Sequence, residues 1–171
     1  MNSIEILIDL AKRPGDAAEQ LRGVLTPELL NAHPHHDNSI AWLLWHAGRE
    51  IDEQIVGLTG GESVWLAAGF AERFGLEVGA HEHGYGHTSE QARAVVVRDP
   101  ELLLAYLSAA IDAQVKYVAG LDEEELRRIV DEGWEPPVTL AARLVSISVD
   151  AAEHVAQATY LTGMGPGAFE D

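Results

Sequence analysis

The sequence contains no cysteine and few positively charged residues. Without cysteine, the chain can form no disulfide, no thiolate zinc site and no cysteine nucleophile. Lysine and arginine together number 11 against 28 acidic residues, which gives a formal net charge of −17. A surface of this sign repels phosphate backbones and anionic lipid headgroups, so we expect neither a nucleic acid nor a membrane as a partner.

Long apolar runs are also missing. No uninterrupted run approaches the roughly 20 residues of a membrane-spanning helix, and the first residues carry acids without the basic leader of a signal peptide. These features predict a cytoplasmic protein. With 171 residues, 47% of them hydrophobic and 23% charged, the chain is expected to form one globular domain over residues 1–171.

Apolar residues recur at helical spacing in longer segments. A capping residue, a proline at the first helical position or a terminal glycine marks most of their ends. Shorter helical pieces are expected at residues 62–76 and just after Thr88, in the crossover that follows the second long segment. The pattern predicts an all-α four-helix bundle with a long crossover containing short helices. The four longer segments cover residues 3–25, 38–58, 99–119 and 139–162.

Other stretches carry more local expectations. Pro14 cannot donate a helical hydrogen bond, so it predicts a kink or break in the first helix. Residues 122–131 begin with acids and end with bases, which favours a short helix. No segment alternates at period two for long enough to predict a strand. Trp134, which precedes two prolines, is expected to plug and anchor its crossover.

The residues with the clearest chemistry are His46, Asp150 and His154. Asp150 and His154 are one helical turn apart, so they lie on the same face of the last helix. His46, on the second helix, can complete the set. Two imidazoles and one carboxylate with open positions are typical of a catalytic divalent metal site. A buried carboxylate without a partner costs several kcal/mol, and one metal ion would satisfy all three residues.

On spacing alone, an alternative remains open in which these residues have structural roles and bind no metal. His46 could be a core histidine with a single hydrogen bond. Asp150 could bond only to His154, or pair with Arg143 or Arg49. Such pairs arise often in helices, and the spacing does not decide between these interpretations.

A glycine-rich segment, HEHGYGH, supplies further candidates at residues 81–87. We expect a loop there, with His81 and His83 on a mobile surface. Tyr85 and His87 lie next to the ordered TSEQ segment and could close over a substrate. The histidine run His33, His35 and His36 is expected to be a solvated loop.

Arg49 follows His46 by almost one helical turn. It could bind an anionic substrate, or it could form an ion pair with Glu53 or Asp52 on its own helix. Trp42, Trp45 and Trp65 are expected in the core.

Five segments together resemble one known family. They are NSIAWLLWHAGREID, VWLAAGFAERFGL, GYGHTSEQ, WEPPVTLAARLVSISVD and EHVAQATYL. The chain resembles the DinB-like (YfiT-like) superfamily, and within it an actinobacterial branch of mycothiol-transferase-like proteins. The resemblance extends roughly from Ile4 to Gly163.

The resemblance implies an up-down-down-up four-helix bundle that holds a divalent metal, zinc or alternatively nickel. It assigns the metal to His46, Asp150 and His154. Many members of the superfamily have histidine where this chain has Asp150, whereas the related mycothiol-dependent maleylpyruvate isomerase is similar in using a carboxylate there. The chain lacks the C-terminal domain of that isomerase, so the isomerisation is not implied.

The activity that the resemblance implies is metal-dependent S-transfer from a low-molecular-weight thiol to a small electrophilic substrate. Tyr85, His87 and Arg49 could orient or protonate that substrate. A metal-dependent hydrolase on the same scaffold, or a non-enzymatic stress-related binding protein with a structural or absent metal, are the alternatives. A homodimer is expected for this class.

Overall fold

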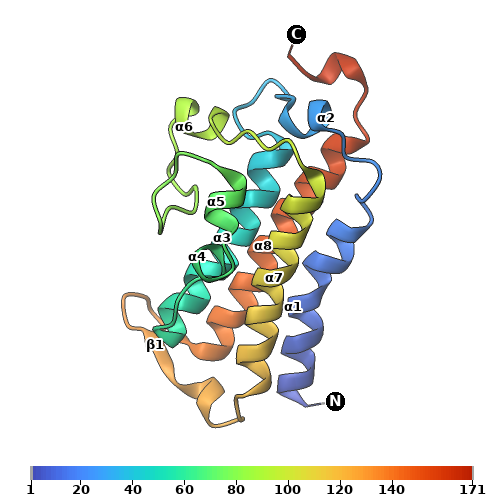
Figure 1. Cartoon of the computed structure of the whole chain (residues 1–171). Coiled ribbons are helices and arrows are strands. Elements are labelled where there is room, and N and C mark those ends of the chain that lie inside the picture. The colour runs from blue at the N-terminus through green and yellow to red at the C-terminus, as the bar shows by residue number, and fades with distance from the viewer. Residues whose placement is uncertain (1, 171) are drawn as a thin grey trace.

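Four long helices run the length of the molecule: α1 (Ser3–Glu19), α3 (Ile40–Thr59), α7 (Pro100–Ala119) and α8 (Leu140–Thr162). The computed structural model describes residues 2–170. The chain rises in α1, descends in α3 and again in α7, and rises in α8 (Figure 1). Because α1 and α3 each pack against both α7 and α8, the helices form a square bundle. The predicted all-α four-helix bundle is confirmed.

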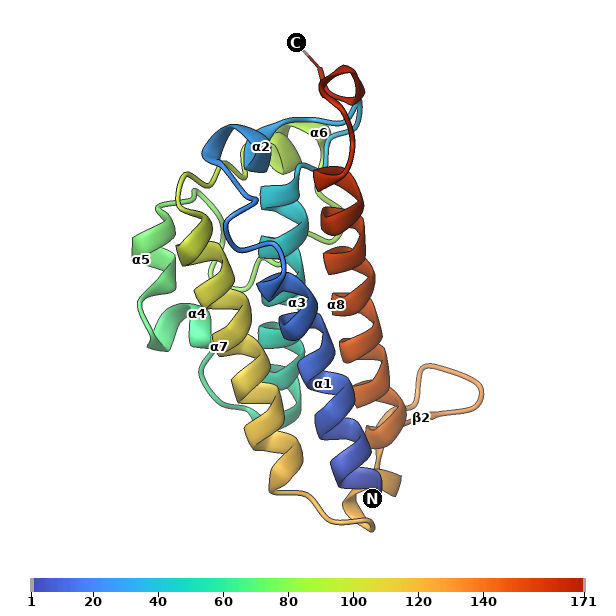
Figure 2. The same cartoon turned by 90° about the vertical axis from the view of Figure 1, so that its right-hand side faces the viewer.

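Short elements occupy the connections between the long helices. The crossover from α3 to α7 carries three short helices, as expected from its sequence. The remaining short elements lie before α3, before α8 and after α8. Between α7 and α8, a pair of strands forms a hairpin beside the beginning of α8 (Figure 2). These elements are α2 (Pro27–Asn31), α4 (Val64–Ala67), α5 (Phe70–Phe74), α6 (Ser89–Arg93), η1 (Glu125–Arg127), β1 (Ile129–Asp131), β2 (Val138–Thr139) and η2 (Pro166–Ala168).

The ends of the two helices that carry the site follow from local hydrogen bonds. The hydroxyl of Ser39 accepts a hydrogen bond from the Trp42 amide and begins α3, and Gly60 ends it with a left-handed φ of 68°. Thr139 caps α8 in the same way, through the amide of Ala142. These caps set which residues of α3 and α8 face the bundle interior.

Of the kink or break expected at Pro14, the break does not occur, since α1 continues through this residue to Glu19. Pro14 is buried, and a Cβ added at the next residue, Gly15, would lie 3.1 Å from Cδ1 of Ile111 on α7. Close packing against α7 therefore stabilises the helix where a backbone hydrogen bond is lost.

The segment before α8 also differs from expectation. Only Glu125–Arg127 is helical, as a turn of 3-10 helix, and Ile129 then pairs antiparallel with Thr139. The strands form through pairing across a loop, and segments this short have no visible alternation in sequence. The prediction of a helix across this segment without any strand was wrong.

By length and composition alone, α7 could cross a membrane, although no long apolar run was expected. The core helix of a globular protein passes the same test, and half of the most apolar window of α7 is buried. The helix packs against α1 and α3. Its apolar character is explained by its place in the bundle.

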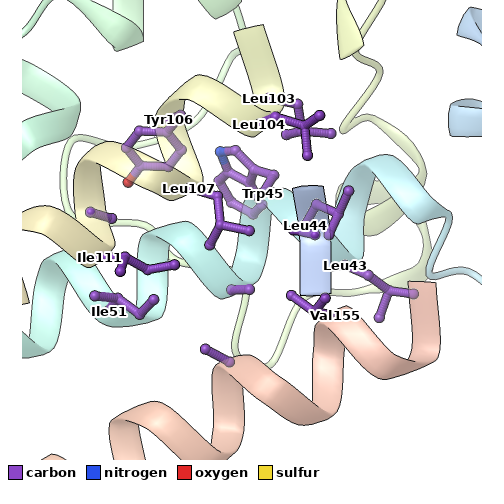
Figure 3. Packing of buried hydrophobic residues seen from close by; sticks show 14 of the residues in the cluster. Leu43, Leu44, Trp45, Ile51, Leu103, Leu104, Tyr106, Leu107, Ile111 and Val155 are labelled. Atoms are coloured by element: carbon purple, nitrogen blue, oxygen red, sulfur yellow. The ribbon is translucent and has the colours of Figure 1, made fainter. Parts of the chain in front are cut away.

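The core is centred on α3, which is buried along most of its first three turns. Trp45 and Tyr106 lie within it, together with leucines of α3 and α7 and Val155 of α8 (Figure 3). Trp45 and Trp65 are buried as predicted. Because α3 is interior on several sides, a polar residue on it must either find a partner inside the protein or face an internal cleft.

Candidate metal centre

His46 is held in a fixed orientation within the bundle. It is only 5% exposed, and its ring stacks on Trp42 with centroids 4.5 Å apart. Its Nδ1 hydrogen-bonds to the backbone carbonyl of His83. A carbonyl can only accept, so Nδ1 carries the proton and Nε2 keeps its lone pair. Burial lowers the pKa of His46 to about 4, which leaves the ring neutral near pH 7.

The α8 residues predicted as its partners lie beside it. Donor atoms of His46, Asp150 and His154 fall within 4.8 Å of one another. Nδ1 of His154 lies 3.2 Å from Oε1 of Gln157, and its Nε2 lies 3.7 Å from Oδ1 of Asp150. A histidine whose Nδ1 is hydrogen-bonded presents Nε2 as a ligand, as is usual in metal sites. The structure thus brings together the residues chosen from the sequence.

Of the partners that the structural interpretation offers Asp150, only His154 lies nearby, with its Nε2 3.7 Å from Oδ1, which is beyond hydrogen-bond distance. Arg143 pairs instead with Asp131 at 2.9 Å, and Arg49 pairs with Glu53 at 2.8 Å. Oδ2 of Asp150 is buried and has no hydrogen-bond partner among the described residues. Partial burial raises the pKa of Asp150, although His154 opposes the shift. An unpartnered carboxylate oxygen beside imidazole nitrogens fits a divalent cation.

These residues line a cleft of about 800 Å³. Tyr85, from the glycine-rich loop, and Trp134, from the hairpin loop, also line it and are 85% and 68% exposed. The prediction that Trp134 is a buried plug was wrong, because the hairpin holds it away from the core. Arg143 lies in the same wall. The floor of the cleft is therefore polar and carries the candidate ligands His46, Asp150 and His154, and its sides carry the aromatic residues Tyr85 and Trp134.

The glycine-rich loop lies against this floor. Nδ1 of His83 is 2.5 Å from Oε1 of Glu50, one turn after His46 on α3. Donor atoms of His46, Glu50 and His83 also fall within 4.8 Å of one another. His83 had been expected on the mobile surface, and only the fold could reveal its position. By contrast, His81 is an exposed residue that pairs with Glu53 at 3.1 Å.

Gly84 allows this close approach. A Cβ at Gly84 would lie 2.9 Å from Nδ1 of His46 and 3.2 Å from a ring carbon of Trp42, and its φ is +102°. Both the contact and the left-handed backbone therefore require glycine.

Arg49 is fully buried and does not line the cleft. Its guanidinium donates to the carbonyls of Ala80 and Glu82, at 2.7 and 2.8 Å, and to the Glu53 carboxylate. It also lies 3.6 Å from Asp52. This matches the ion-pair alternative raised for Arg49 and ties the loop to α3.

His87, like Arg49, supports the site from behind the cleft wall. The indole N–H of Trp42 donates to its Nδ1 at 3.2 Å, and its Nε2 contacts Oε1 of Glu82 at 2.8 Å. The side chain is buried and does not line the cleft. It fixes the Trp42 ring on which His46 stacks. The His33–His36 run lies on another loop and joins neither ligand set.

Comparison with known proteins shows the family of the chain. A family model described as mycothiol-S-transferase matches residues 10–163. The chain belongs to the mycothiol-S-transferase family. Both helices that carry the candidate ligands of this mycothiol-S-transferase family member lie inside the matched region. Membership supports an S-transferase-like function.

One similar solved structure is the crystal structure of a conserved protein from Enterococcus faecalis. It is 33% identical to this mycothiol-S-transferase family member, with a TM-score of 0.86. The match covers 95% of this chain and 96% of that chain. No curated protein matched the sequence.

Proposed function

We propose that this protein is a metal-dependent transferase that joins a low-molecular-weight thiol of the mycothiol type to a small electrophile. The observation that carries the proposal is the convergence of His46, Asp150 and His154 on the floor of an open cleft. Family membership favours thiol transfer over the other reactions that such a site could catalyse.

The three residues would hold zinc, or alternatively nickel. When bound, such an ion lowers the pKa of a thiol and makes a thiolate available near neutral pH. The protein's part is to keep His46 neutral, through burial, and to keep its Nε2 toward the cleft, through the carbonyl of His83. Asp150 contributes the negative charge that favours a cation there.

In the proposed reaction the thiol releases its proton to solvent, its sulfur forms a bond to the electrophilic carbon, and the leaving group departs with the electron pair of the bond that breaks. Because the chain has no cysteine, the sulfur must come from the thiol cosubstrate. Tyr85, at the mouth of the cleft, can contact or protonate the electrophile. His87 and Arg49 act as positioning residues, since both are buried behind the cleft wall.

The test combines metal analysis with a conjugation assay. Protein purified without a histidine tag should contain close to one equivalent of metal per chain, and it should accelerate coupling of mycothiol to monochlorobimane. His46→Ala and His154→Ala should each lose metal and activity together. Tyr85→Phe should retain metal and lower turnover.

The outcomes separate the alternatives. Activity that survives His46→Ala would exclude the proposed mechanism. A metal content that stays below one equivalent and does not change in His154→Ala would favour a binding protein. Ester or amide hydrolysis without thiol coupling would favour the hydrolase.

A further inference from the structure

The outward face of α8 carries a feature that the proposed function does not use. α8 runs along one side of the bundle (Figure 2), and six uncharged residues on its solvent side alternate in spacing between three and four positions. These residues, the α8 seam, are Ala142, Val145, Val149, Ala152, Ala156 and Thr159. Val145 and Val149 are each 40% exposed. None of the six lines the metal cleft.

The spacing of the α8 seam is that of a coiled coil, in which one helix packs against another. The stripe of α8 that faces the core is a different one and includes Leu144, Ala151 and Val155, each at most 1% exposed. α8 therefore has two apolar stripes, and the outer one is open to solvent along most of its length. An apolar stripe of this length on the surface indicates a docking site.

Charge distinguishes the α8 seam from the outward faces of α1 and α7. On each of those helices the exposed acids, such as Asp16 and Asp112, outnumber the exposed bases. In a chain with a net charge of −17, such faces repel a second copy and attract a basic protein. The α8 seam has no charge over about five turns. It therefore offers a basic protein no ion pair, and a second copy meets no repulsion where the two would touch.

The sizes of the seam residues fit a second copy that lies antiparallel. If a twofold axis passes beside residues 150 and 151, Val149 of one copy lies opposite Ala152 of the partner subunit. Val145 then lies opposite the partner subunit's Ala156. Each valine meets an alanine, so the larger side chains fill the spaces beside the smaller ones. A parallel arrangement would place valine on valine and alanine on alanine, which leaves gaps between the helices.

We infer that the α8 seam is the contact surface of an antiparallel homodimer. Each copy supplies the same patch, as a closed twofold dimer requires. The metal cleft of each copy stays open, because the seam residues do not line it, and neither the metal nor the reaction is needed for the contact. One pair of helices buries less than the roughly 1,200 Å² of a standard interface, so we expect a dissociation constant in the micromolar range.

Analytical ultracentrifugation of the full chain tests the contact. The mass of the parent should rise from 18.5 kDa toward twice that value across the micromolar range. Added salt should favour the dimer, because it screens the repulsion between two acidic copies. Val149→Glu and Ala156→Glu should each weaken association by about tenfold or more, since they place charge inside the contact.

The matched control for Ala156→Glu is Ala105→Glu. Ala105 is an exposed alanine of α7 and lies outside the α8 seam. This variant adds the same charge to the chain and should keep the association constant of the parent. Far-UV circular dichroism should show the same helix content in all variants.

Disulfide crosslinking tests the antiparallel direction, since the chain has no cysteine of its own. A mixture of the single variants Val145→Cys and Ala156→Cys, oxidised with copper–phenanthroline, should form a disulfide between two different copies. Either variant alone should form none. In the antiparallel dimer the two copies of one such position are about 16 Å apart along the helix axes, whereas a disulfide spans at most about 7 Å between Cα atoms.

Each other outcome is decisive. A parent that stays monomeric at millimolar concentration would overturn the inference and leave the α8 seam to a different protein. A dimer that neither Val149→Glu nor Ala156→Glu weakens would place the contact elsewhere and overturn the inference too. A disulfide in the Val145→Cys variant alone, with none in the mixture between Val145→Cys and Ala156→Cys, would overturn the antiparallel direction.

Discussion

The backbone carbonyl of His83 accepts a hydrogen bond from Nδ1 of His46. This bond connects the glycine-rich loop to the central helix of the bundle. It sets the tautomer of His46 and presents Nε2 to the cleft. Changes in the loop should therefore alter the metal centre even where they remove no ligand.

Gly84→Ala should displace the loop from His46. The new methyl group would meet Nδ1 of His46 at 2.9 Å, and that crowding adds to the strain of a positive φ. We expect zinc affinity, measured by competition with a chromophoric chelator, to fall about tenfold or more.

Gly86→Ala is the control for this substitution. Gly86 also has a positive φ, +75°, but a Cβ there would have nothing within 4 Å. Backbone strain should lower the free energy of unfolding of this variant by about 1 kcal/mol or somewhat more, and its zinc affinity should be retained. Equal effects on affinity would contradict the crowding argument.

Arg49→Met should strongly destabilise the fold. The substitution leaves the buried carboxylate of Asp52 and the partly buried carboxylate of Glu53 without their cation, and it frees the carbonyls of Ala80 and Glu82. Removing one partner of a buried ion pair costs about 3–5 kcal/mol. Urea unfolding measures the loss.

An exposed pair provides the comparison for Arg49. Arg13 lies 2.7 Å from Asp9, with both side chains more than half exposed. Arg13→Met should cost no more than about 1 kcal/mol. A similar cost for the two variants would mean that Arg49 does not hold the loop as described.

Asp150→Asn should separate metal binding from stability. In metal-free protein, the neutral amide removes a partly buried charge whose Oδ2 has no partner, so stability should be unchanged or slightly higher. At a free zinc concentration a hundred times the dissociation constant, zinc should raise the free energy of unfolding of the parent by about 2.7 kcal/mol. The variant should gain little of this stabilisation. Thermal melts with and without zinc measure both effects.

The control for this prediction is Asp112→Asn, an exposed acid on α7. It should affect neither the metal-free melt nor the zinc-induced shift. A large loss of stability in metal-free Asp150→Asn would instead show that Asp150 has a structural partner.

The sequence predicts the parts of the site that lie on long helices. Helical spacing places Asp150 and His154 on one face, and the apolar pattern of α3 turns His46 inward. It could not place His83 beside Glu50, or show that Arg49 binds the carbonyls of Ala80 and Glu82. Those contacts depend on where a glycine-rich loop folds back, and loop conformation leaves no periodic pattern in sequence.

The segment of residues 165–170 should lose protection from hydrogen exchange at acid pH. Arg93 on α6 binds the carboxylates of Asp37 and Glu170, and these bonds lower the pKa of both acids. Carboxylates with lowered pKa values stabilise the fold above their ordinary pKa, near 4, and lose that contribution as pH falls through the lowered value. Hydrogen exchange should show lower protection factors, measured against the intrinsic exchange rate at each pH, around residues 165–170 below about pH 4.

Arg93→Gln is the control for the acid effect. It removes the cation that lowers both pKa values, so protection factors in residues 165–170 should already be low at neutral pH and change little on acidification. A tail that stays equally protected in the variant would mean that Arg93 does not hold it.

Anomalous scattering at the zinc edge tests the central claim most directly. In crystals grown with one equivalent of zinc, we predict one strong peak about 2.0–2.2 Å from Nε2 of His46, Nε2 of His154 and a carboxylate oxygen of Asp150. A map with no peak there, or with zinc bound only at the His33–His36 run, would contradict the account.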